Sequence, residues 1–277
     1  MLNRIAAILL AAALLSVWGC GPQTTPKSSV PALTTSSAQL PASTPAAGEA
    51  LLVAAASDLQ FAFKDIAALY QQQTGQQVIV TFGSTGTLSQ QIENGAPYDL
   101  FAAADESYIN GLNTKGLTIT DTQQLYAQGR IVLAVNKQSG LQVTDLKQLA
   151  DSTIKQVSIA NPDHAPYGKA AMQAMQAAGV WEQVKPRLVY GDNVTQALQF
   201  IQTGNAPVGI VALSVASVPE VSYTLIDAKL HDPLNQKLTV LKRTKLSDAA
   251  RAFITFVNGP QGRPIMKKYG FALPGEL

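Results

Sequence analysis

Four strand-to-helix junctions in the sequence carry small, uncharged hydrogen-bond donors. At each junction an apolar run ends at hydroxyl, glycine or amide residues, and a helical pattern begins directly afterwards. The candidate donors are Ser57, Thr85 with the neighbouring Ser84, Tyr167 and Val194. A helix N-terminus has backbone N–H groups without internal partners and a partial positive charge, so it favours anions. Several such termini directed at one point would bind an oxyanion without any lysine or arginine.

The elements that would position these donors are those of an α/β protein. Apolar runs typical of strands alternate with runs of helical spacing, which favours mostly parallel sheets with crossover helices. Strands are expected over residues 51–56, 78–82, 99–103, 130–135, 156–160, 187–190, 207–213, 223–226 and 237–241. Helices are expected after each of the first three strands and over residues 145–150, 168–178, 194–202, 248–257 and 261–268. Ligands of open α/β sheets bind at the carboxyl ends of strands, and all four junctions are expected there.

The same residues also have a purely structural interpretation. Ser57, Thr85 and either Asp192 or Asn193 are residue types that cap helix N-termini wherever a helix begins. Tyr167 could be a packed aromatic residue beside a turn. Spacing alone therefore leaves helix capping and ligand binding both open at these junctions.

The N-terminal part of the chain is typical of an export signal followed by a tether. Residues 1–19 are predicted to be a secretory signal peptide, in which Arg4 precedes an apolar stretch over residues 5–17. Residues 20–49 are rich in Pro, Ser, Thr and Ala without periodicity, which predicts a disordered tether. Cys20 is the only cysteine, so the sequence excludes disulfides within the chain and metal sites built on thiolates.

Charge and motifs argue against several other function classes. The net charge is +2 without Lys/Arg clusters, so we do not expect nucleic-acid binding. An exported serine hydrolase remains an alternative, with Ser57 or Ser84 as the nucleophile and His164 as the base. However, the chain contains no Gly-x-Ser-x-Gly motif. A tethered adhesion or scaffold module is a further alternative.

Several segments resemble the periplasmic molybdate-binding proteins of ABC importers. These segments are residues 54–57, 82–101, 161–168, 204–211, 259–261 and 268–271. The resemblance implies a two-lobed type II periplasmic-binding-protein fold, each lobe being a mostly parallel sheet flanked by helices. Lobe I would comprise residues 50–129 and 229–277, and lobe II residues 130–228. The ligand would lie in the cleft between the lobes.

The resemblance also implies which residues bind the anion. The family's donors fall on the hydroxyl and backbone of Ser57, on the hydroxyl of Thr85 or alternatively Ser84, and on the backbone amides of Tyr167 and Val194. These groups would bind molybdate, and tungstate similarly, through its oxygen atoms, so molybdenum would have no direct protein ligand.

Two positions depart from what such a site needs. Many members of the family carry a tyrosine where this chain has Ala212. One donor is therefore missing unless the Tyr167 hydroxyl replaces it. Asp58 is the second departure, because its carboxylate would repel a dianion. We expect its side chain to point away and to support the positive end of its helix.

The resemblance further implies partners and a location. The protein would capture molybdate and deliver it to the membrane permease of an ABC importer, without enzymatic activity or a cofactor, and as a monomer. The segment 17–20 resembles a bacterial lipobox, which implies lipidation of Cys20 and a lipid anchor at the cell envelope. The nearest alternative is a binder of another oxyanion or of a small organic acid on the same fold.

Overall fold

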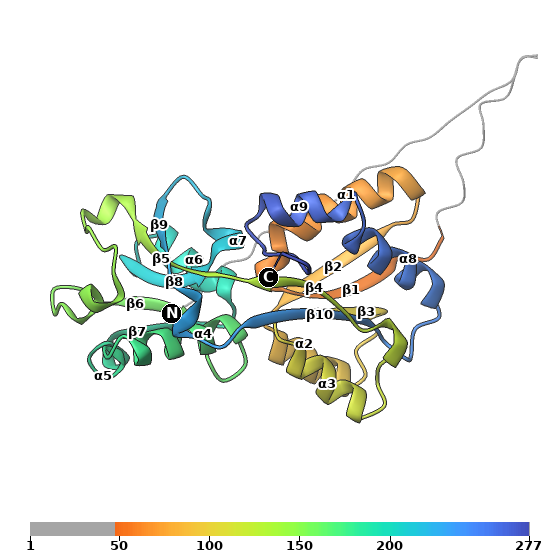
Figure 1. Ribbon diagram of the computed structural model, residues 1–277, viewed down its shortest axis with the longest axis horizontal. Coiled ribbons are helices and arrows are strands. Elements are labelled where there is room, and N and C mark those ends of the chain that lie inside the picture. Colours follow the sequence, from red (N-terminus) through yellow and green to blue (C-terminus); the bar gives the residue numbers. More distant parts are fainter. Residues whose placement is uncertain (1–47, 277) are drawn as a thin grey trace, which may run out of the picture. The chain divides into compact units, whose positions relative to one another are not determined.

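The computed structural model describes residues 48–276. The predicted signal peptide, Cys20 and all but the last two residues of the predicted tether lie outside the described residues. The described chain forms two five-stranded sheets flanked by helices (Figure 1). We call the first sheet with its helices lobe I, and the second sheet with its helices lobe II.

The sheet of lobe I has the strand order β2–β1–β3–β10–β4. Its strands are β1 (Leu51–Ala56), β2 (Val78–Gly83), β3 (Leu100–Ala103), β4 (Gln124–Gly129) and β10 (Leu234–Val240). β1 is parallel to β2 and β3, whereas β10 is antiparallel to β3 and β4. Ala56 and Gly83 are register partners, so Ser57 and Ser84 follow at the same edge of the sheet.

The sheet of lobe II has the strand order β7–β6–β8–β5–β9. Its strands are β5 (Ile131–Asn136), β6 (Val157–Ala160), β7 (Leu188–Gly191), β8 (Val208–Ala212) and β9 (Val221–Leu225). β6 is parallel to β7 and β8, whereas β5 is antiparallel to β8 and β9. Ala160 and Gly191 are register partners, so the loops that lead to Tyr167 and Val194 leave one edge of this sheet.

Helices connect and cover these strands. The α-helices are α1 (Gln60–Thr74), α2 (Thr85–Glu93), α3 (Glu106–Thr114), α4 (Pro166–Ala177), α5 (Trp181–Val184), α6 (Val194–Gln202), α7 (Leu213–Ala216), α8 (Ser247–Asn258) and α9 (Gly262–Lys268). The short 3-10 helices are η1 (Ser57–Leu59), η2 (Thr120–Thr122), η3 (Lys137–Ser139), η4 (Leu146–Ala150), η5 (Lys185–Arg187) and η6 (Ala228–Leu230). α1 ends at Gly75, whose φ of 74° lies in the left-handed region that glycine adopts without strain.

The two faces of the lobe I sheet pack into separate apolar layers. On one face Val53 packs with α1 and α8, where the Phe253 ring lies 6.1 Å from Phe63 and 5.2 Å from Tyr70, centroid to centroid. On the other face Ala54 packs with α2 and α3. The helix residues of this second layer are Leu88, Ile92, Ile109 and Leu112. Because both faces are covered, β1 is apolar throughout its length rather than alternating.

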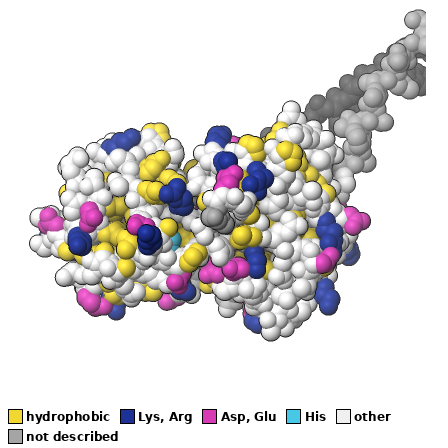
Figure 2. Space-filling model, viewed as in Figure 1, with side chains coloured by type: hydrophobic (Ala, Val, Ile, Leu, Met, Phe, Trp, Pro, Cys, Tyr) yellow, Lys and Arg dark blue, Asp and Glu magenta, His cyan; other side chains and the backbone are white. Residues whose placement is uncertain are grey.

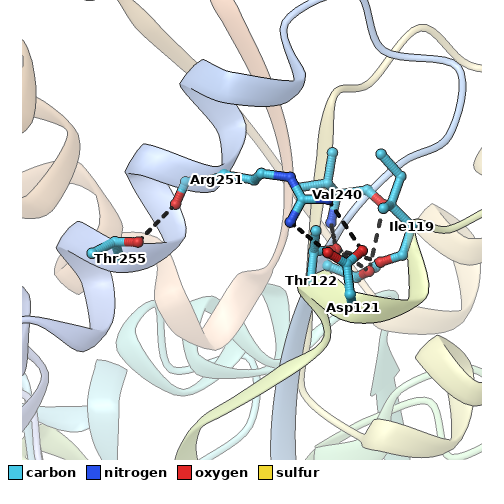
Figure 3. Close-up of polar contacts among 7 residues, drawn as sticks. Ile119, Asp121, Thr122, Val240, Arg251 and Thr255 are labelled. Carbon is cyan, nitrogen blue, oxygen red and sulfur yellow. Dashed lines mark hydrogen bonds and ion pairs between the residues drawn. The ribbon is translucent and has the colours of Figure 1, made fainter.

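An ion pair joins helix α8 to the 3-10 helix η2 (Figure 3). The guanidinium of Arg251 donates to both carboxylate oxygens of Asp121, at 2.9 and 3.1 Å. This contact holds the pKa of Asp121 below its ordinary value. The Thr122 hydroxyl accepts from the Val240 amide through its oxygen and donates its proton to the Ile119 carbonyl. These contacts attach η2 to the edge of lobe I.

Charged side chains are interspersed on the surface. On the face shown in Figure 2, Lys and Arg lie among Asp, Glu and uncharged residues without forming one continuous basic area. Within residues 48–276, no helix combines the length and the apolar character needed to cross a membrane.

The structure confirms the α/β class and adds details to the expected elements. First, each mostly parallel sheet contains one reversed strand, β10 in lobe I and β5 in lobe II. The chain passes between the lobes through Arg130, between β4 and β5, and through residues 226–233, between β9 and β10. β5 and β10 each begin at the edge of their sheet that faces the other lobe, because the chain enters the lobe at that edge. The neighbouring strands end at the same edge, so β5 and β10 run opposite to them. Second, β4 (Gln124–Gly129) is a strand that the sequence pattern did not predict.

Candidate functional site

The four predicted junctions meet at one cavity between the lobes. Its walls include all five predicted residues: Ser57, Ser84 and Thr85 from lobe I, and Tyr167 and Val194 from lobe II. The cavity measures about 10 Å³, the space of about one water molecule. A tetrahedral oxyanion is larger, so binding requires the walls to move apart from this conformation and close again on the ligand.

Ser57 offers an unused hydroxyl to this cavity. The residue directly follows β1 and opens η1, which continues into α1. Its side chain is buried, and its hydroxyl has no hydrogen-bond partner among residues 48–276. Its carbonyl oxygen accepts from the Thr195 hydroxyl of α6 at 3.1 Å, a contact between the lobes. The hydroxyl of Ser57 is therefore free to donate to a ligand.

Ser84 and Thr85 have different roles in the structure. Ser84 is the N-cap of α2, and its hydroxyl oxygen accepts from the Thr87 amide at 3.3 Å. It also donates to the Thr87 hydroxyl at 2.8 Å. The Thr85 hydroxyl oxygen accepts from the Ala104 amide at 3.1 Å, which leaves its own proton available. Thr85 is thus the better placed donor of the pair, and Ser84 chiefly stabilises the helix start.

Tyr167 and Val194 present backbone amides. Each lies in the first turn of its helix, where N–H groups have no partner within the helix. Asn193 caps α6, and its side-chain oxygen accepts from the amides of Thr195 and Gln196 at 3.0 and 3.1 Å. In the described chain, the amides of Tyr167 and Val194 themselves have no acceptor. These two N–H groups can donate to an anion in the cavity.

The Tyr167 hydroxyl donates to a protein group. It donates to Asp58 Oδ2 at 3.0 Å, across the lobe boundary. A tyrosine hydroxyl has one proton. In this conformation it therefore does not replace the donor that is missing at Ala212, which lies at the end of β8.

Asp58 is placed differently from our expectation that it points away from the site. The residue lines the cavity and is 1% exposed. Its Oδ2 accepts from Tyr167 and from Gln236 Nε2, the latter at 2.7 Å. Its Oδ1 has no partner in the described structure. Burial raises the pKa of Asp58 to about 6, although the hydrogen bonds from Gln236 and Tyr167 and the residue's own backbone amide partly oppose this shift.

A buried polar network holds the Asp58 carboxylate in place. Gln236 also lies 3.0 Å from the Tyr167 hydroxyl, and its Oε1 accepts from the Tyr126 hydroxyl at 2.8 Å. Gly129 makes room for this network, because a Cβ there would overlap the Tyr167 hydroxyl and the Gln236 amide. Gln236 was not predicted from the sequence, although strand periodicity places it on the same face as the apolar Leu234 and Leu238, where a polar residue is unusual. A polar residue on an otherwise apolar strand face was therefore the signal in the sequence that could have identified Gln236.

Contacts on both sides of the cavity close the lobes together. The Gly86 amide donates to the His164 carbonyl at 2.9 Å, and the Ser84 hydroxyl lies 2.9 Å from His164 Nδ1. On the other side, the Ser214 hydroxyl donates to the Asp58 carbonyl at 2.8 Å. The structure therefore represents the closed arrangement of the two lobes.

The Ser84–His164 contact lacks the rest of a hydrolase triad. A catalytic serine–histidine pair needs a third group that orients the histidine. Among residues 48–276, His164 has no hydrogen bond from its side chain to a carboxylate. The Ser84 hydroxyl is also occupied as a helix cap.

A larger groove of about 380 Å³ lies on lobe II, away from the junctions. Apolar residues such as Leu133 and Leu225 line it together with Asp145 and Asp227. Lys147 also lines this groove, but the two carboxylates outnumber its single positive charge and disfavour an anion. The smaller cavity, which gathers four helix starts, is the candidate anion site.

Comparisons with known proteins agree with this geometry. A sequence model of the family described as bacterial extracellular solute-binding protein matches residues 51–272. The molybdate-binding protein ModA of Azotobacter vinelandii is 37% identical over 225 residues, which cover 80% of this chain and 89% of that protein. ModA of Rhodobacter capsulatus is 35% identical, covering 82% of this chain and 90% of that protein.

A solved structure shows the same architecture. The periplasmic molybdate-binding protein of Azotobacter vinelandii superposes with a TM-score of 0.75 at 30% sequence identity, covering 81% of this chain and 99% of that structure. This likeness confirms the two-lobed α/β fold that the sequence predicts.

Proposed function

Because the chain belongs to the family of bacterial extracellular solute-binding proteins, we propose that its solute is molybdate, which it delivers to the membrane permease of an ABC importer. The similarity to molybdate-binding proteins over about four fifths of the chain supports this ligand. The family binds solutes and is not enzymatic, which confirms our expectation that the protein is not an enzyme.

The observation that carries the proposal is the meeting of four helix starts, none of which contributes a lysine or arginine, at one cavity. Molybdate is a tetrahedral dianion near neutral pH, and its four oxygens only accept hydrogen bonds. The hydroxyls of Ser57 and Thr85 and the amides of Tyr167 and Val194 would donate to these oxygens. A hydrogen bond to a charged acceptor contributes about 1.5–3 kcal/mol net, so several of them suffice for tight binding after ordering costs.

Size and charge would determine which oxyanions the site accepts. Tungstate has nearly the size of molybdate, so we propose that it binds similarly. Sulfate has the same charge and shape but is smaller, and donors held at the molybdate distance cannot all reach it. In the described chain the cavity walls include no lysine or arginine, which disfavours an organic carboxylate as the ligand.

Capture would couple to movement of the lobes. The cavity of about 10 Å³ has to open for the anion to enter, and Arg130 and residues 226–233 are the connections about which the lobes can turn. Donors from both lobes would then close on the anion, so that the closed form, which the permease recognises, depends on bound ligand. All candidate donors come from one chain, so we propose that the protein acts as a monomer.

A ligand panel tests this function. The melting temperature of the purified full-length protein would be measured with molybdate, tungstate, sulfate, phosphate and chromate. At about a hundred times Kd, the bound anion adds about 2.7 kcal/mol of stability. We expect molybdate and tungstate to stabilise the protein and sulfate to have little effect. Equal stabilisation by sulfate would contradict the proposal and favour a general oxyanion binder.

We also propose that Cys20 carries a lipid anchor that holds the protein at the cell envelope, with residues 20–49 as a tether. The lipobox-like segment 17–20 supports this proposal. Metabolic labelling with a fatty acid should mark the wild-type protein and not the Cys20→Ser variant. A label that persists in the variant would contradict lipidation at this residue.

A further inference from the structure

Asp58 is a buried carboxyl group at the proposed anion site, and its two oxygens are not equivalent. Oδ2 accepts from the Tyr167 hydroxyl at 3.0 Å and from Gln236 Nε2 at 2.7 Å. Oδ1 is buried and has no partner among residues 48–276. Buried polar atoms nearly always have a partner, and an exception calls for an explanation. Asp58 is one of the residues that line the cavity, so a ligand that enters there is the natural partner for Oδ1.

The network fixes which oxygen can carry a proton. Gln236 Oε1 accepts from Tyr126, which turns the amide nitrogen of Gln236 towards Asp58. Oδ2 therefore faces two donors and has to act as an acceptor. A proton on the carboxyl group consequently belongs on Oδ1, where it needs an acceptor. An oxyanion supplies one, whereas an ionised Oδ1 would be repelled by it.

We propose that Asp58 binds the oxyanion as a neutral acid that donates its Oδ1 proton to a ligand oxygen, so that capture of the anion takes up one proton. This inference rests on the proposed function. Asp58 would contribute a donor at a site that lacks one at Ala212. Anion binding and protonation of Asp58 would be reciprocally coupled, each raising the affinity of the protein for the other.

The surroundings of Asp58 favour the neutral acid. Its side chain faces Tyr167 of α4, Tyr126 of β4 and the neutral Gln236 of β10. Both tyrosines have a pKa raised well above the ordinary value by burial and by Asp58, so they stay neutral. Within the described chain no lysine, arginine or histidine pairs with Asp58 to stabilise its charge. Burial already raises its pKa to about 6, and an adjacent dianion would raise it further.

Calorimetry on the full-length protein tests the inference. Molybdate would be titrated between pH 6 and pH 8.5, at each pH in buffers with different heats of ionisation, which gives Kd and the number of protons taken up. For the wild type we expect uptake of about one proton at pH 7.5 and a Kd that rises about tenfold per pH unit towards pH 8.5.

Two variants separate the role of Asp58 from other causes of pH dependence. In Asp58→Asn, Gln236 and Tyr167 require an acceptor, so the asparagine oxygen takes the place of Oδ2 and its N–H group takes the place of the Oδ1 proton. We expect no proton uptake, a Kd independent of pH, and tighter binding than the wild type at pH 8.5. Asp65→Asn is the matched control, because Asp65 of α1 bonds to Lys268 and Tyr269 on the surface. It should retain the pH dependence of the wild type.

The possible results are distinguishable. A wild type that binds molybdate with a constant Kd and without proton uptake would overturn the inference and leave the proposed function intact. Tight binding of hydrogen phosphate without proton uptake would also overturn it, because Asp58 would then act as an acceptor for the ligand's own proton. A wild type that binds neither molybdate nor tungstate at any pH would instead contradict the proposed function.

Discussion

Ser57→Ala offers a sharp test of the site, because the hydroxyl it removes has no other structural role. In the described chain, the Ser57 hydroxyl makes no hydrogen bond, although the residue is only 5% exposed. The substitution therefore leaves no protein donor or acceptor without a partner. The ligand-free protein should keep its stability, and the whole effect should fall on anion binding.

The expected loss follows from one hydrogen bond to a charged acceptor. Such a bond contributes about 1.5–3 kcal/mol, which corresponds to an increase in Kd of about 10- to 140-fold. Calorimetry at constant pH would measure Kd for molybdate, and urea denaturation without ligand would measure the free energy of unfolding.

Ser84→Ala is the matched comparison for Ser57→Ala. It removes the N-cap of α2, which should lower the free energy of unfolding by about 0.5–2 kcal/mol while weakening binding less than Ser57→Ala does. Unchanged affinity of Ser57→Ala would refute the assignment of Ser57 as a donor. A larger affinity loss in Ser84→Ala would show that Ser84 is the donor instead.

Three further changes have defined outcomes. Gly86→Ala would place a Cβ 2.7 Å from the His164 carbonyl oxygen across the cleft. This overpacking should weaken molybdate binding by about 1–3 kcal/mol with little change in ligand-free stability. A Kd equal to that of the wild type would contradict the contact between Gly86 and His164 in the closed form. Phe253→Ala removes a fully buried ring and should cost about 3–5 kcal/mol of unfolding free energy in urea; a smaller loss would mean that the core of lobe I collapses around the gap. Folding raises the pKa of Asp58 from 3.8 to about 6, so its contribution to stability is present below about pH 4 and is lost as pH rises through 6. Relative to the wild type, ligand-free Asp58→Asn should therefore gain up to about 3 kcal/mol between pH 4 and pH 8, and a constant difference in unfolding free energy would contradict the burial of the charge.

Local sequence patterns predicted most elements of the fold. β1 was predictable because Leu51–Ala56 is an uninterrupted apolar run, and α6 because Asn193 caps a strongly periodic segment. β4 was missed, since Gln124–Gly129 is short and half polar. Its pairing with β10, more than a hundred residues later, decides its conformation. Tertiary pairing of this kind leaves little trace in the local pattern.

The candidate site was predictable as a set of donors but not in its hydrogen bonding. Helix starts at strand ends indicated Ser57, Thr85 and Val194. The choice between Thr85 and Ser84 needed coordinates, because both are good cap residues and only the contact with Ala104 distinguishes them. Asp58 was misjudged, because its position depends on Gln236, 178 residues away in the sequence. Such distant polar contacts cannot be inferred from spacing.

The hydrogen bond from Tyr167 to Asp58 also suggests how cargo could be unloaded. Tyr167 belongs to lobe II and Asp58 to lobe I, so a transporter that pulls the lobes apart breaks this bond and admits water to the acid. Hydration would return the acidity of Asp58 towards that of an ordinary aspartate. The Asp58 carboxyl group, which binds the anion as a neutral acid, would then ionise, and its negative charge would repel the anion and promote its release.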